Sequence, residues 1–465
     1  MRREKKILFV TPHFPPSPSV GTQRMVKFMK YLKQDGWEVF VLTLKEKYYP
    51  GQQIVDYGVL LDSQVQVIRT GKIDPFLWWD RLKRFFRKKR KAPTEKPEKA
   101  TATVKPKAKP EKSQRGSLFF QIKEFVTRMM QYPDRENGWI IPVFFHAFRL
   151  IRKHKIPYVF SSSPPHSPYI ALNALRRLIS FTYVTDFRDP WARSQWSKEV
   201  RNLYEKTARY LDLRYEEKTL KIADVLIFNN DVLLQEYLSC YPNSGIREKS
   251  AVLTNGFDPQ FTDLKQVLAP KATRGLDEIV IIHAGTLYKK RDPRKIFDAF
   301  IQFREQQPEV ARRIRFKFLG HITPDLQYLH AYVQENQLSS QVEFLPSQPY
   351  EVALAAMKDA DWLLILQPVT RIQVPAKFFD YLTIPRPIWG VVEPHSISEK
   401  LIHQLGVGVV SYNDSRKSLI EFFEFIGREP QPRFQPDASE MQKFMVPNIV
   451  RRLEEILSTV EERGD

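Results

Sequence analysis

Cysteine is almost absent from this 465-residue chain, where Cys240 is the single one. One cysteine excludes a disulfide framework and a thiolate metal cage, and it is typical of a reducing compartment. Apolar runs are short, and none approaches the roughly 20 residues that span a bilayer. The opening residues, MRREKKILFVTPHF, lack a signal-peptide cleavage site and predict a buried strand. These absences predict a cytoplasmic protein, either soluble or peripheral to a membrane.

Two phosphate-binding motifs are also absent. No strand is followed by G-x-G-x-x-G, which disfavours a dinucleotide-dependent oxidoreductase, and G-x-x-x-x-G-K-[ST] does not occur, which removes the P-loop class. Asp359 and Asp361 have the spacing of a metal-binding D-x-D motif. They lie where a helix meets a buried strand, so we interpret them as a structural junction and expect no catalytic metal and no cofactor.

Apolar residues are plentiful, at 42% of the chain, which suits two cores and excludes global disorder. Apolar strand-like segments alternate with helix-like segments along residues 1–260 and again along residues 275–435. The alternation predicts parallel sheets with right-handed crossovers. The expected fold class is α/β, with two Rossmann-like doubly wound domains facing each other across a cleft. A polar segment, 262–277, marks the boundary, and a last helix within 436–465 is expected to return toward the N-terminal domain.

The formal net charge is +20, and most of it lies in one segment. Residues 81–115 hold 15 Lys/Arg and three Glu, a net charge of +12. They belong to a predicted insertion, 76–117, that is largely extended or disordered. Amphipathic flanks around the basic loop, within 76–130, predict contact with an anionic membrane surface. The alternatives are a solvated loop whose flanking aromatics pack on the first domain, and nucleic-acid binding, which is disfavoured because no recognition fold accompanies the charge.

Ligands of open α/β sheets bind beyond the carboxyl ends of the strands, so the loops there are the candidate sites. The first such loop is PHFPPSPSVGTQR. Its Gly21 and Thr22 open a helix whose free backbone N–H groups are suited to a phosphate or a sugar hydroxyl. The alternative is a glycine-assisted turn without a ligand.

A second candidate loop, HAGTLYKKRDPRKIF, follows the first strand of the second domain. Gly285 permits close backbone approach, and Lys290 and Arg291 lie beside the next helix, which Asp292 is predicted to cap before Pro293. A leaving nucleoside diphosphate develops negative charge, which fixed cations and helix N-termini stabilise without a metal. The alternative is a solvated charged turn.

The third candidate segment is VPAKFFDYL. Pro375 is predicted to begin a helix, which leaves the N–H groups around Ala376 and Lys377 free. Lys377 and Asp380 are three residues apart and share one helical face, which we expect to point into the cleft. A carboxylate can accept two hydrogen bonds from a ribose diol. The alternative is a surface ion pair worth under ~1 kcal/mol.

These segments together resemble a known family. HAGTLYKKRDP followed by VPAKFFDYL resembles the donor-binding domain of GT-B glycosyltransferases of the retaining, family-four type. SSSPPHSPYIAL, TDFRDPW and YPDRENGW resemble a branch that acts in bacterial surface polysaccharide assembly. The resemblance implies transfer of a hexose from a nucleoside-diphosphate sugar, UDP or GDP, to a hydroxyl acceptor on a lipid-linked or polysaccharide glycan. It also implies retention. The basic amphipathic insertion suggests that the acceptor is lipid-linked, and it predicts a position at the inner face of the cell membrane.

The resemblance assigns residues by position. Arg291 stands where the family's basic residue contacts the donor diphosphate, and Asp380 matches the second acidic residue of an E-x7-E pattern that holds the ribose. Two positions depart, because Thr286 replaces the other common cation and Ile372 replaces the first acidic residue. The predicted donor-binding residues are Gly21, Thr22, Gly285, Thr286, Lys290, Arg291, Pro375, Ala376, Lys377 and Asp380.

The resemblance also places two loops of the first domain near the transferred sugar. A histidine or a carboxylate there can orient the acceptor hydroxyl or accept its proton. The alternatives are a loop histidine without a role and an ion pair that braces the loop. The predicted catalytic residues are His166, Asp186, Arg188 and Asp189, with Ser163 in the sugar loop.

Two other functions stay open from the residues. One is a sugar-nucleotide epimerase-like GT-B enzyme, since a fold does not fix its chemistry. The other is a catalytically degenerate membrane scaffold, which the two departures favour and the retained Arg291, Lys377 and Asp380 oppose.

Overall fold

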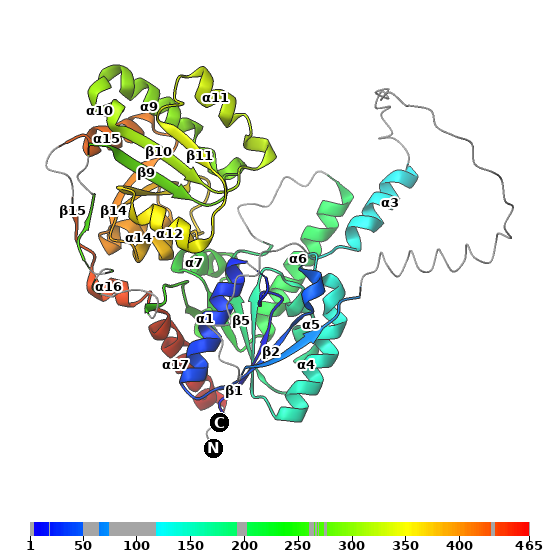
Figure 1. Cartoon of the computed structure of the whole chain (residues 1–465). Coiled ribbons are helices and arrows are strands. Elements are labelled where there is room, and N and C mark those ends of the chain that lie inside the picture. Colours follow the sequence, from blue (N-terminus) through cyan, green and yellow to red (C-terminus); the bar gives the residue numbers. More distant parts are fainter. Residues whose placement is uncertain are drawn as a thin grey trace, which may run out of the picture. The chain divides into compact units, whose positions relative to one another are not determined.

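The computed structural model describes residues 4–17, 19–49, 65–73, 118–192, 202–259, 265, 267, 269–273, 277–428 and 433–464. The predicted insertion at 76–117 lies outside the described residues. The chain divides into two compact units (Figure 1). Unit 1 comprises residues 1–22 and 36–226, and unit 2 comprises residues 23–35 and 227–465.

The first sheet has seven strands in the order β3-β2-β1-β4-β5-β6-β7. β1 pairs in parallel with both β2 and β4, so the chain reverses its direction of winding between β1 and β4. The strands are rich in apolar residues because helices cover the sheet. Their bounds are β1 Lys6–Val10, β2 Glu38–Leu44, β3 Gln66–Thr70, β4 Tyr158–Ser163, β5 Thr182–Phe187, β6 Val225–Phe228 and β7 Ser250–Val252.

The helices between these strands carry the periodicity of amphipathic segments. In α1, Met25, Phe28, Met29 and Leu32 recur at helical spacing and all are buried. The helix ends before Gly36, whose φ of +83° is accessible to glycine at low cost. The bounds are α1 Val20–Gln34, α3 Leu118–Met129, α4 Ile140–His154, α5 Ser167–Leu175, α6 Leu203–Ile222 and α7 Asp231–Cys240.

The second sheet has six strands in the order β11-β10-β9-β12-β13-β14, again parallel, with its reversal between β9 and β12. Apolar clusters fill both of its faces. The strands are β9 Ile279–Ala284, β10 Ile314–Leu319, β11 Val342–Leu345, β12 Trp362–Gln367, β13 Ile388–Val392 and β14 Gly408–Tyr412. The helices are α9 Arg294–Gln306, α10 Pro308–Arg313, α11 Leu329–Glu335, α12 Tyr350–Lys358, α13 Lys377–Leu382, α14 Ile397–Leu405, α15 Arg416–Ile426, α16 Ala438–Gln442 and α17 Val446–Gly464.

The predicted α/β class with two doubly wound units is confirmed, and the predicted domain bounds stay predictions. The last helix differs from the single one expected, because it is divided into α16 and α17. Between them, the Phe444 carbonyl accepts the N–H of Phe257, and the Phe257 carbonyl accepts the N–H of Val446. This exchange takes backbone groups that a continuous helix needs. None of the helices that the structure describes has both the length and the apolar character needed to cross a membrane.

The interpretation of Asp361 as a structural residue agrees with its contacts. Its carboxylate accepts the N–H of Val280 at 2.9 Å, and its own N–H donates to the Val280 carbonyl at 2.8 Å. Asp361 is buried and links the start of β12 to β9, so these contacts give it a structural role.

Candidate functional site

Each sheet has one point where the direction of winding reverses, and ligands of doubly wound sheets bind in the crevice at that point. In the first sheet the loops after β1 and β4 flank it, and in the second sheet the loops after β9 and β12 do so. The predicted site segments follow these strands in both sheets, except that Arg188 and Asp189 follow β5, the neighbour of β4.

Two glycines bring backbone and side chain close together at the carboxyl end of β9. Gly285 has φ +138°, and a Cβ built on it would lie 2.4 Å from the Lys377 Nζ atom. Gly320, with φ +152°, follows β10, and its Cβ would lie 2.5 Å from the Gly285 carbonyl oxygen. Both positions therefore need glycine. The Lys377 ammonium group consequently rests directly against the loop after β9.

His283, which was not predicted as a site residue, accepts a hydrogen bond from this lysine. Its Nδ1 atom lies 2.9 Å from the Leu364 carbonyl oxygen, which can only accept, so Nδ1 carries the proton. In the neutral ring Nε2 then has a free lone pair, and Lys377 Nζ donates to it at 3.0 Å. The buried imidazole thereby fixes both its own tautomer and the position of the ammonium group.

Burial makes the lysine charge costly in the absence of an anion. Burial, followed by the charge of Arg291, lowers the pKa of Lys377 well below its usual range. Burial also lowers the pKa of His283 well below its usual range, and raises the pKa of Asp380. An anion bound beside Lys377 would stabilise its charged form, so the arrangement is suited to a phosphate.

Arg291 is the second cation at this end of the sheet. It ends a short 3-10 turn, Lys289–Arg291, and its Nη2 donates to the Gln367 Oε1 atom at the end of β12 at 3.2 Å. Its guanidinium lies 5.1 Å from the ring centre of Tyr288. These contacts give Arg291 a defined direction, whereas Lys290 in the same turn and Thr286 are exposed.

Two helix starts differ from the predictions by one or two residues. α9 begins at Arg294 with Pro293 as its N-cap, although the Asp292 carboxylate accepts the N–H of Arg294 at 3.0 Å. α13 begins at Lys377 with Ala376 as its N-cap, and the N–H groups of Phe378 and Phe379 donate to the carbonyls of Pro375 and Ala376 in its first turn.

Lys377 and Asp380 are both partly buried and lie on one side of α13. Within the described part of the chain, no ion pair joins the two side chains. The two charges still act on each other, because Asp380 favours the charged form of Lys377 and Lys377 favours the charged form of Asp380. The Asp380 carboxylate lies on the same side of α13 as the Lys377 ammonium group. The predicted contact with a ribose needs a carboxylate at this place.

In unit 1 the loop after β1 is fastened to the loops after β4 and β5. A Cβ on Gly21 would lie 2.2 Å from Arg188 Nη1, so glycine makes room for the guanidinium. Arg188 Nε donates to the Ser163 carbonyl at 3.2 Å, and its Nη2 donates to the Pro164 carbonyl. The N–H of Thr22 donates to the Ser19 carbonyl at 2.9 Å, so the prediction of a free N–H there is wrong.

His13, also missed from the sequence, completes this junction. Its Nε2 lies 2.8 Å from the Pro164 carbonyl, so Nε2 carries the proton and Nδ1 accepts from the Ser19 hydroxyl at 2.7 Å. Burial, with a contribution from Arg188, lowers the pKa of His13 to about 4. The neutral ring is thus a fixed connector between loops.

The loop that contains His166 is positioned by Asp134, in the segment YPDRENGW. The Asp134 Oδ2 atom accepts the N–H groups of His166 at 2.7 Å and Ser167 at 2.9 Å. The His166 ring stacks on Trp191, with centroids 4.3 Å apart. Burial lowers the pKa of His166 to about 3, which makes the ring a weak base.

Two predicted loop residues lie in strands. Ser163 is the last residue of β4 and Asp186 lies in β5, and both are fully buried. The Asp186 carboxylate accepts the Ser162 hydroxyl at 2.6 Å, so it braces neighbouring strands. The placement of Asp186 in a loop is therefore wrong, whereas Arg188 and Asp189 do follow the strand.

Comparisons with known proteins agree at the level of the fold. No protein-family model matches the sequence, and no curated protein does. Among solved structures, sucrose-phosphate synthase from Thermosynechococcus elongatus has 14% identity over 99% of this chain and 98% of the other, with a TM-score of 0.53. HepE of Anabaena, in complex with UDP-glucose, has 13% identity over 98% and 99%, with a TM-score of 0.55.

An α,α-trehalose-phosphate synthase (UDP-forming) from Burkholderia xenovorans, in complex with glucose-6-phosphate, has 10% identity over 98% and 100%, with a TM-score of 0.59. In each case the likeness covers nearly the whole of both chains. At these sequence identities the similarity shows the fold alone. The chain therefore has the GT-B fold that its motifs predicted.

Proposed function

We propose that this chain is a glycosyltransferase that moves a hexose from a nucleoside-diphosphate sugar, with UDP or GDP as the nucleotide, to a hydroxyl acceptor. The observation that carries the proposal is the Lys377 ammonium group held against Gly285 by His283, with Arg291 directed by Gln367 at the same end of the sheet. Two of the structures with this fold contain UDP-glucose or are described as UDP-forming, which supports a uridine nucleotide.

The proposed chemistry places the positive charges on the leaving group. As the bond between the sugar C1 atom and the diphosphate oxygen breaks, charge develops on the diphosphate, and Lys377 and Arg291 stabilise it more in the transition state than in the ground state. The acceptor oxygen forms its bond to C1 on the same face, with retention, and its proton passes to the departing diphosphate. Asp380 holds the ribose. No metal is needed for this charge stabilisation.

The acceptor is proposed to be a lipid-linked or polysaccharide glycan, bound by the loops of unit 1. Arg188 is the best placed of the predicted residues there, because it contacts both Ser163 and Pro164 at the end of β4. Segment 76–130 is proposed to bind the inner, anionic face of the cell membrane. Of that segment the structure describes α3 and the residues that follow it.

The test is donor binding followed by turnover. Thermal shift with UDP, GDP, ADP and CMP should show stabilisation by one nucleoside diphosphate, by about 2–3 kcal/mol at 100 times its Kd. The Arg291→Ala variant should lose it, and Lys289→Ala, an exposed cation of the same turn, should keep it. Transfer assays with the matching sugar then separate a transferase from an epimerase or a scaffold. The absence of both a shift and transfer with all four nucleotides would contradict the proposal.

A further inference from the structure

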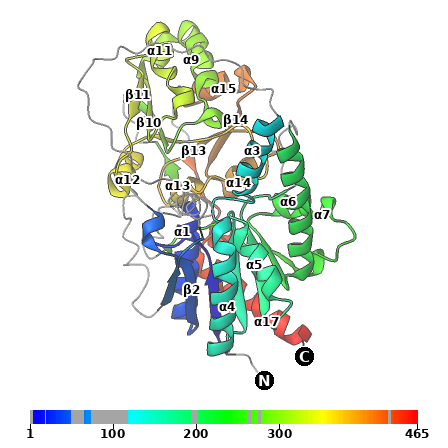
Figure 2. The same ribbon diagram turned by 90° about the vertical axis from the view of Figure 1, so that its right-hand side faces the viewer.

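The outward face of α4 is apolar although it is exposed. α4 already uses one face for packing, through the buried side chains of Val143, Ala147 and Ile151. A second stripe runs along its other side, at positions i, i+4 and i+7, which share one face of a helix. It consists of Ile141, Phe145 and Phe148, whose exposed fractions are 56%, 63% and 37%. Figures 1 and 2 both show α4 outside the sheet of unit 1.

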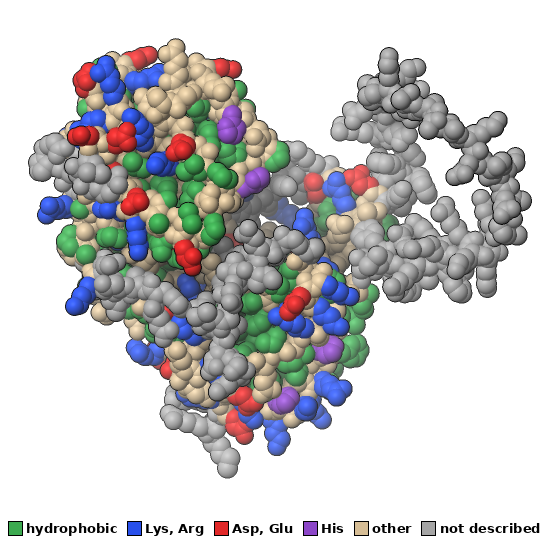
Figure 3. Space-filling view, in the orientation of Figure 1, with side chains coloured by type: hydrophobic (Ala, Val, Ile, Leu, Met, Phe, Trp, Pro, Cys, Tyr) green, Lys and Arg blue, Asp and Glu red, His purple; other side chains and the backbone are tan. Residues whose placement is uncertain are grey.

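Cations, and no carboxylate, follow the stripe along the chain. The segment RLIRKHK, residues 149–155, contains Arg149, Arg152, Lys153 and Lys155. Basic residues in the last turn are favourable for the helix dipole, which explains part of this cluster. The dipole does not explain exposed phenylalanines beside it. Figure 3 shows hydrophobic side chains interspersed with Lys and Arg over the edge where Figure 1 places α4.

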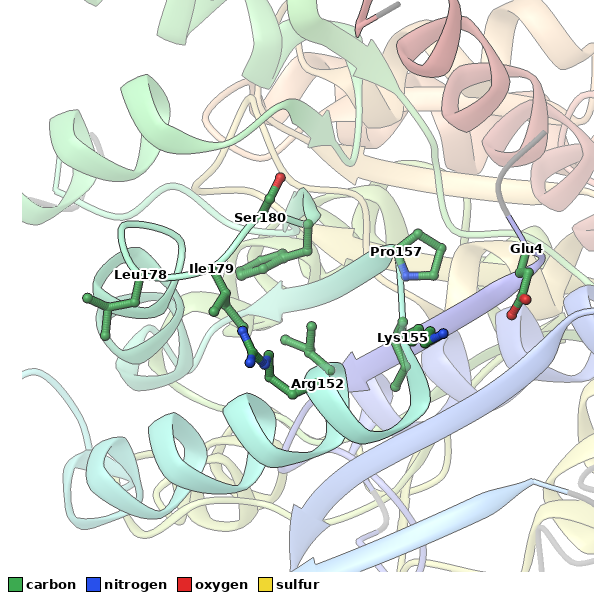
Figure 4. Close-up of a pocket in the computed structure, with 10 residues that line it drawn as sticks. Glu4, Arg152, Lys155, Pro157, Leu178, Ile179 and Ser180 are labelled. Carbon is green, nitrogen blue, oxygen red and sulfur yellow. The ribbon is translucent and has the colours of Figure 1, made fainter. Parts of the chain in front are cut away.

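A basic cavity lies at the end of the stripe. Arg152 and Lys155 line an open space of about 620 Å³, together with Leu178, which is 65% exposed (Figure 4). Glu4 also lines it, but its carboxylate is paired with Lys6 at 2.6 Å. Lys155 also acts on the Glu4 charge, but Arg152 and Lys155 together outnumber this carboxylate. The cavity therefore combines excess positive charge with exposed aliphatic surface, which suits a lipid phosphate and the first part of its acyl chain.

We infer that the outward face of α4 binds an anionic phospholipid bilayer. This face is defined by the exposed residues Ile141, Phe145, Phe148, Arg149, Arg152 and Lys155, with Leu178 beside them. Phenylalanines would enter the boundary between headgroups and acyl chains while the cations contact lipid phosphates. A second copy of the chain is a poorer occupant, because a two-fold interface would bring these cations together. The surface lies outside segment 76–130, and the inference does not rest on glycosyl transfer.

Flotation of the full chain with vesicles of phosphatidylcholine, with and without phosphatidylglycerol, tests the apolar stripe. The variant Phe145→Ser with Phe148→Ser should partition about five-fold less into the anionic vesicles. The matched control is Tyr350→Ser with Val352→Ser, which removes two exposed apolar side chains from α12 in unit 2. The control should bind as the wild type does.

A second pair of variants tests the cations. Arg149→Gln with Arg152→Gln should lower partitioning into the anionic vesicles about ten-fold, while the basic segment 76–130 keeps part of the preference. Arg312→Gln with Lys417→Gln, two exposed cations of unit 2, should bind as the wild type does. Equal binding of the α4 variants and their controls would overturn the inference. The inference would also be overturned if the α4 variants changed the mass measured by sedimentation but not the binding to vesicles, because that result would identify a protein–protein interface.

A direct probe covers the case in which a double variant fails to fold. In a Cys240→Ser background, Phe145→Cys labelled with an environment-sensitive fluorophore should shift to the blue when anionic vesicles are added. The same label at Val352→Cys, an exposed position of α12 in unit 2, should not shift. No shift at position 145 would overturn the inference. Nucleotide-induced thermal stabilisation, measured on the same proteins, reports the proposed donor site separately.

Discussion

At the residue scale, His283 is the side chain on which the proposed donor site depends, because its Nε2 atom fixes the Lys377 ammonium group. We expect His283→Leu to weaken binding of the nucleoside diphosphate about ten-fold, since an unfixed ammonium group loses part of a charge-assisted hydrogen bond. His283→Gln, which retains an acceptor at the end of its side chain, should recover part of the affinity. Isothermal titration calorimetry gives the affinities.

The control for His283 is a double-mutant cycle. If the histidine acts through the lysine, His283→Leu in a Lys377→Met background should have little further effect on affinity. Independent, additive losses would show that His283 serves only the packing of β9.

The lowered pKa of Lys377 predicts a pH dependence of donor binding. The ammonium group is charged below its lowered pKa and neutral above it, so affinity for the diphosphate should fall as pH rises through that pKa. Between the lowered pKa of Lys377 in the folded chain and the ordinary lysine pKa of about 10.4, the unfolded chain binds more protons than the folded chain. The free energy of unfolding should therefore rise with pH in this range. Lys377→Arg remains charged, and its affinity should be flat above pH ~7. A wild-type profile as flat as that of the arginine variant would contradict the assignment.

At the element scale, α13 carries Lys377 and Asp380, and a lysine distant in sequence holds its end. Lys271 is fully buried, and its Nζ donates to the carbonyls of Leu382 at 3.0 Å and Ile384 at 2.7 Å. We expect Lys271→Met to lower the free energy of unfolding by about 2–3 kcal/mol, because two buried carbonyls lose their partner. Urea unfolding measures this loss.

The Lys271 variant should also weaken nucleotide binding, because α13 loses its anchor. The control is Lys358→Met, an exposed lysine in the same unit, which should change neither quantity. If the free energy of unfolding of Lys271→Met equalled that of the wild type, the carbonyls of Leu382 and Ile384 would have found other hydrogen-bond partners.

The same elements show what the sequence could and could not predict. Continuous apolar runs such as those of β1, β9 and β12 identify buried parallel strands, so the fold class and the order of elements were predictable. β3 was missed because its residues are mostly exposed or half-buried, and it lacks that signal. Lys271 lies in a segment interpreted as a polar boundary, and nothing in its neighbourhood indicates that it turns inward.

The candidate site was predictable where glycine and charge follow a strand, as at Gly285 and Arg291. His13, Asp134 and His283 were missed because their roles arise from contacts with backbone groups 32 to 151 positions away, which form only when the chain folds. A histidine on a buried strand has the same local pattern whether it fills space or holds a lysine. Residues that act by positioning others therefore leave little trace in the sequence.

At the scale of the whole molecule, the two units carry different parts of the proposed reaction. The donor determinants, Arg291, Lys377 and Asp380, all lie in unit 2, whereas Arg188 lies in unit 1 at the end of its own sheet. We expect Arg188→Lys to reduce the rate of transfer about 100-fold, because a lysine cannot reproduce two directed donors, while thermal stabilisation by the nucleotide stays intact. Lys377→Met should lose both.

The control for unit 1 is Arg177→Lys, an exposed arginine outside the candidate loops, which should retain both properties. A parallel loss of nucleotide stabilisation in Arg188→Lys would show that unit 1 contributes to donor binding and that the division of roles is wrong. Retained transfer would instead remove Arg188 from the acceptor site. Since binding is measured without an acceptor and transfer requires both substrates, the two measurements distinguish a donor defect from an acceptor defect in one molecule.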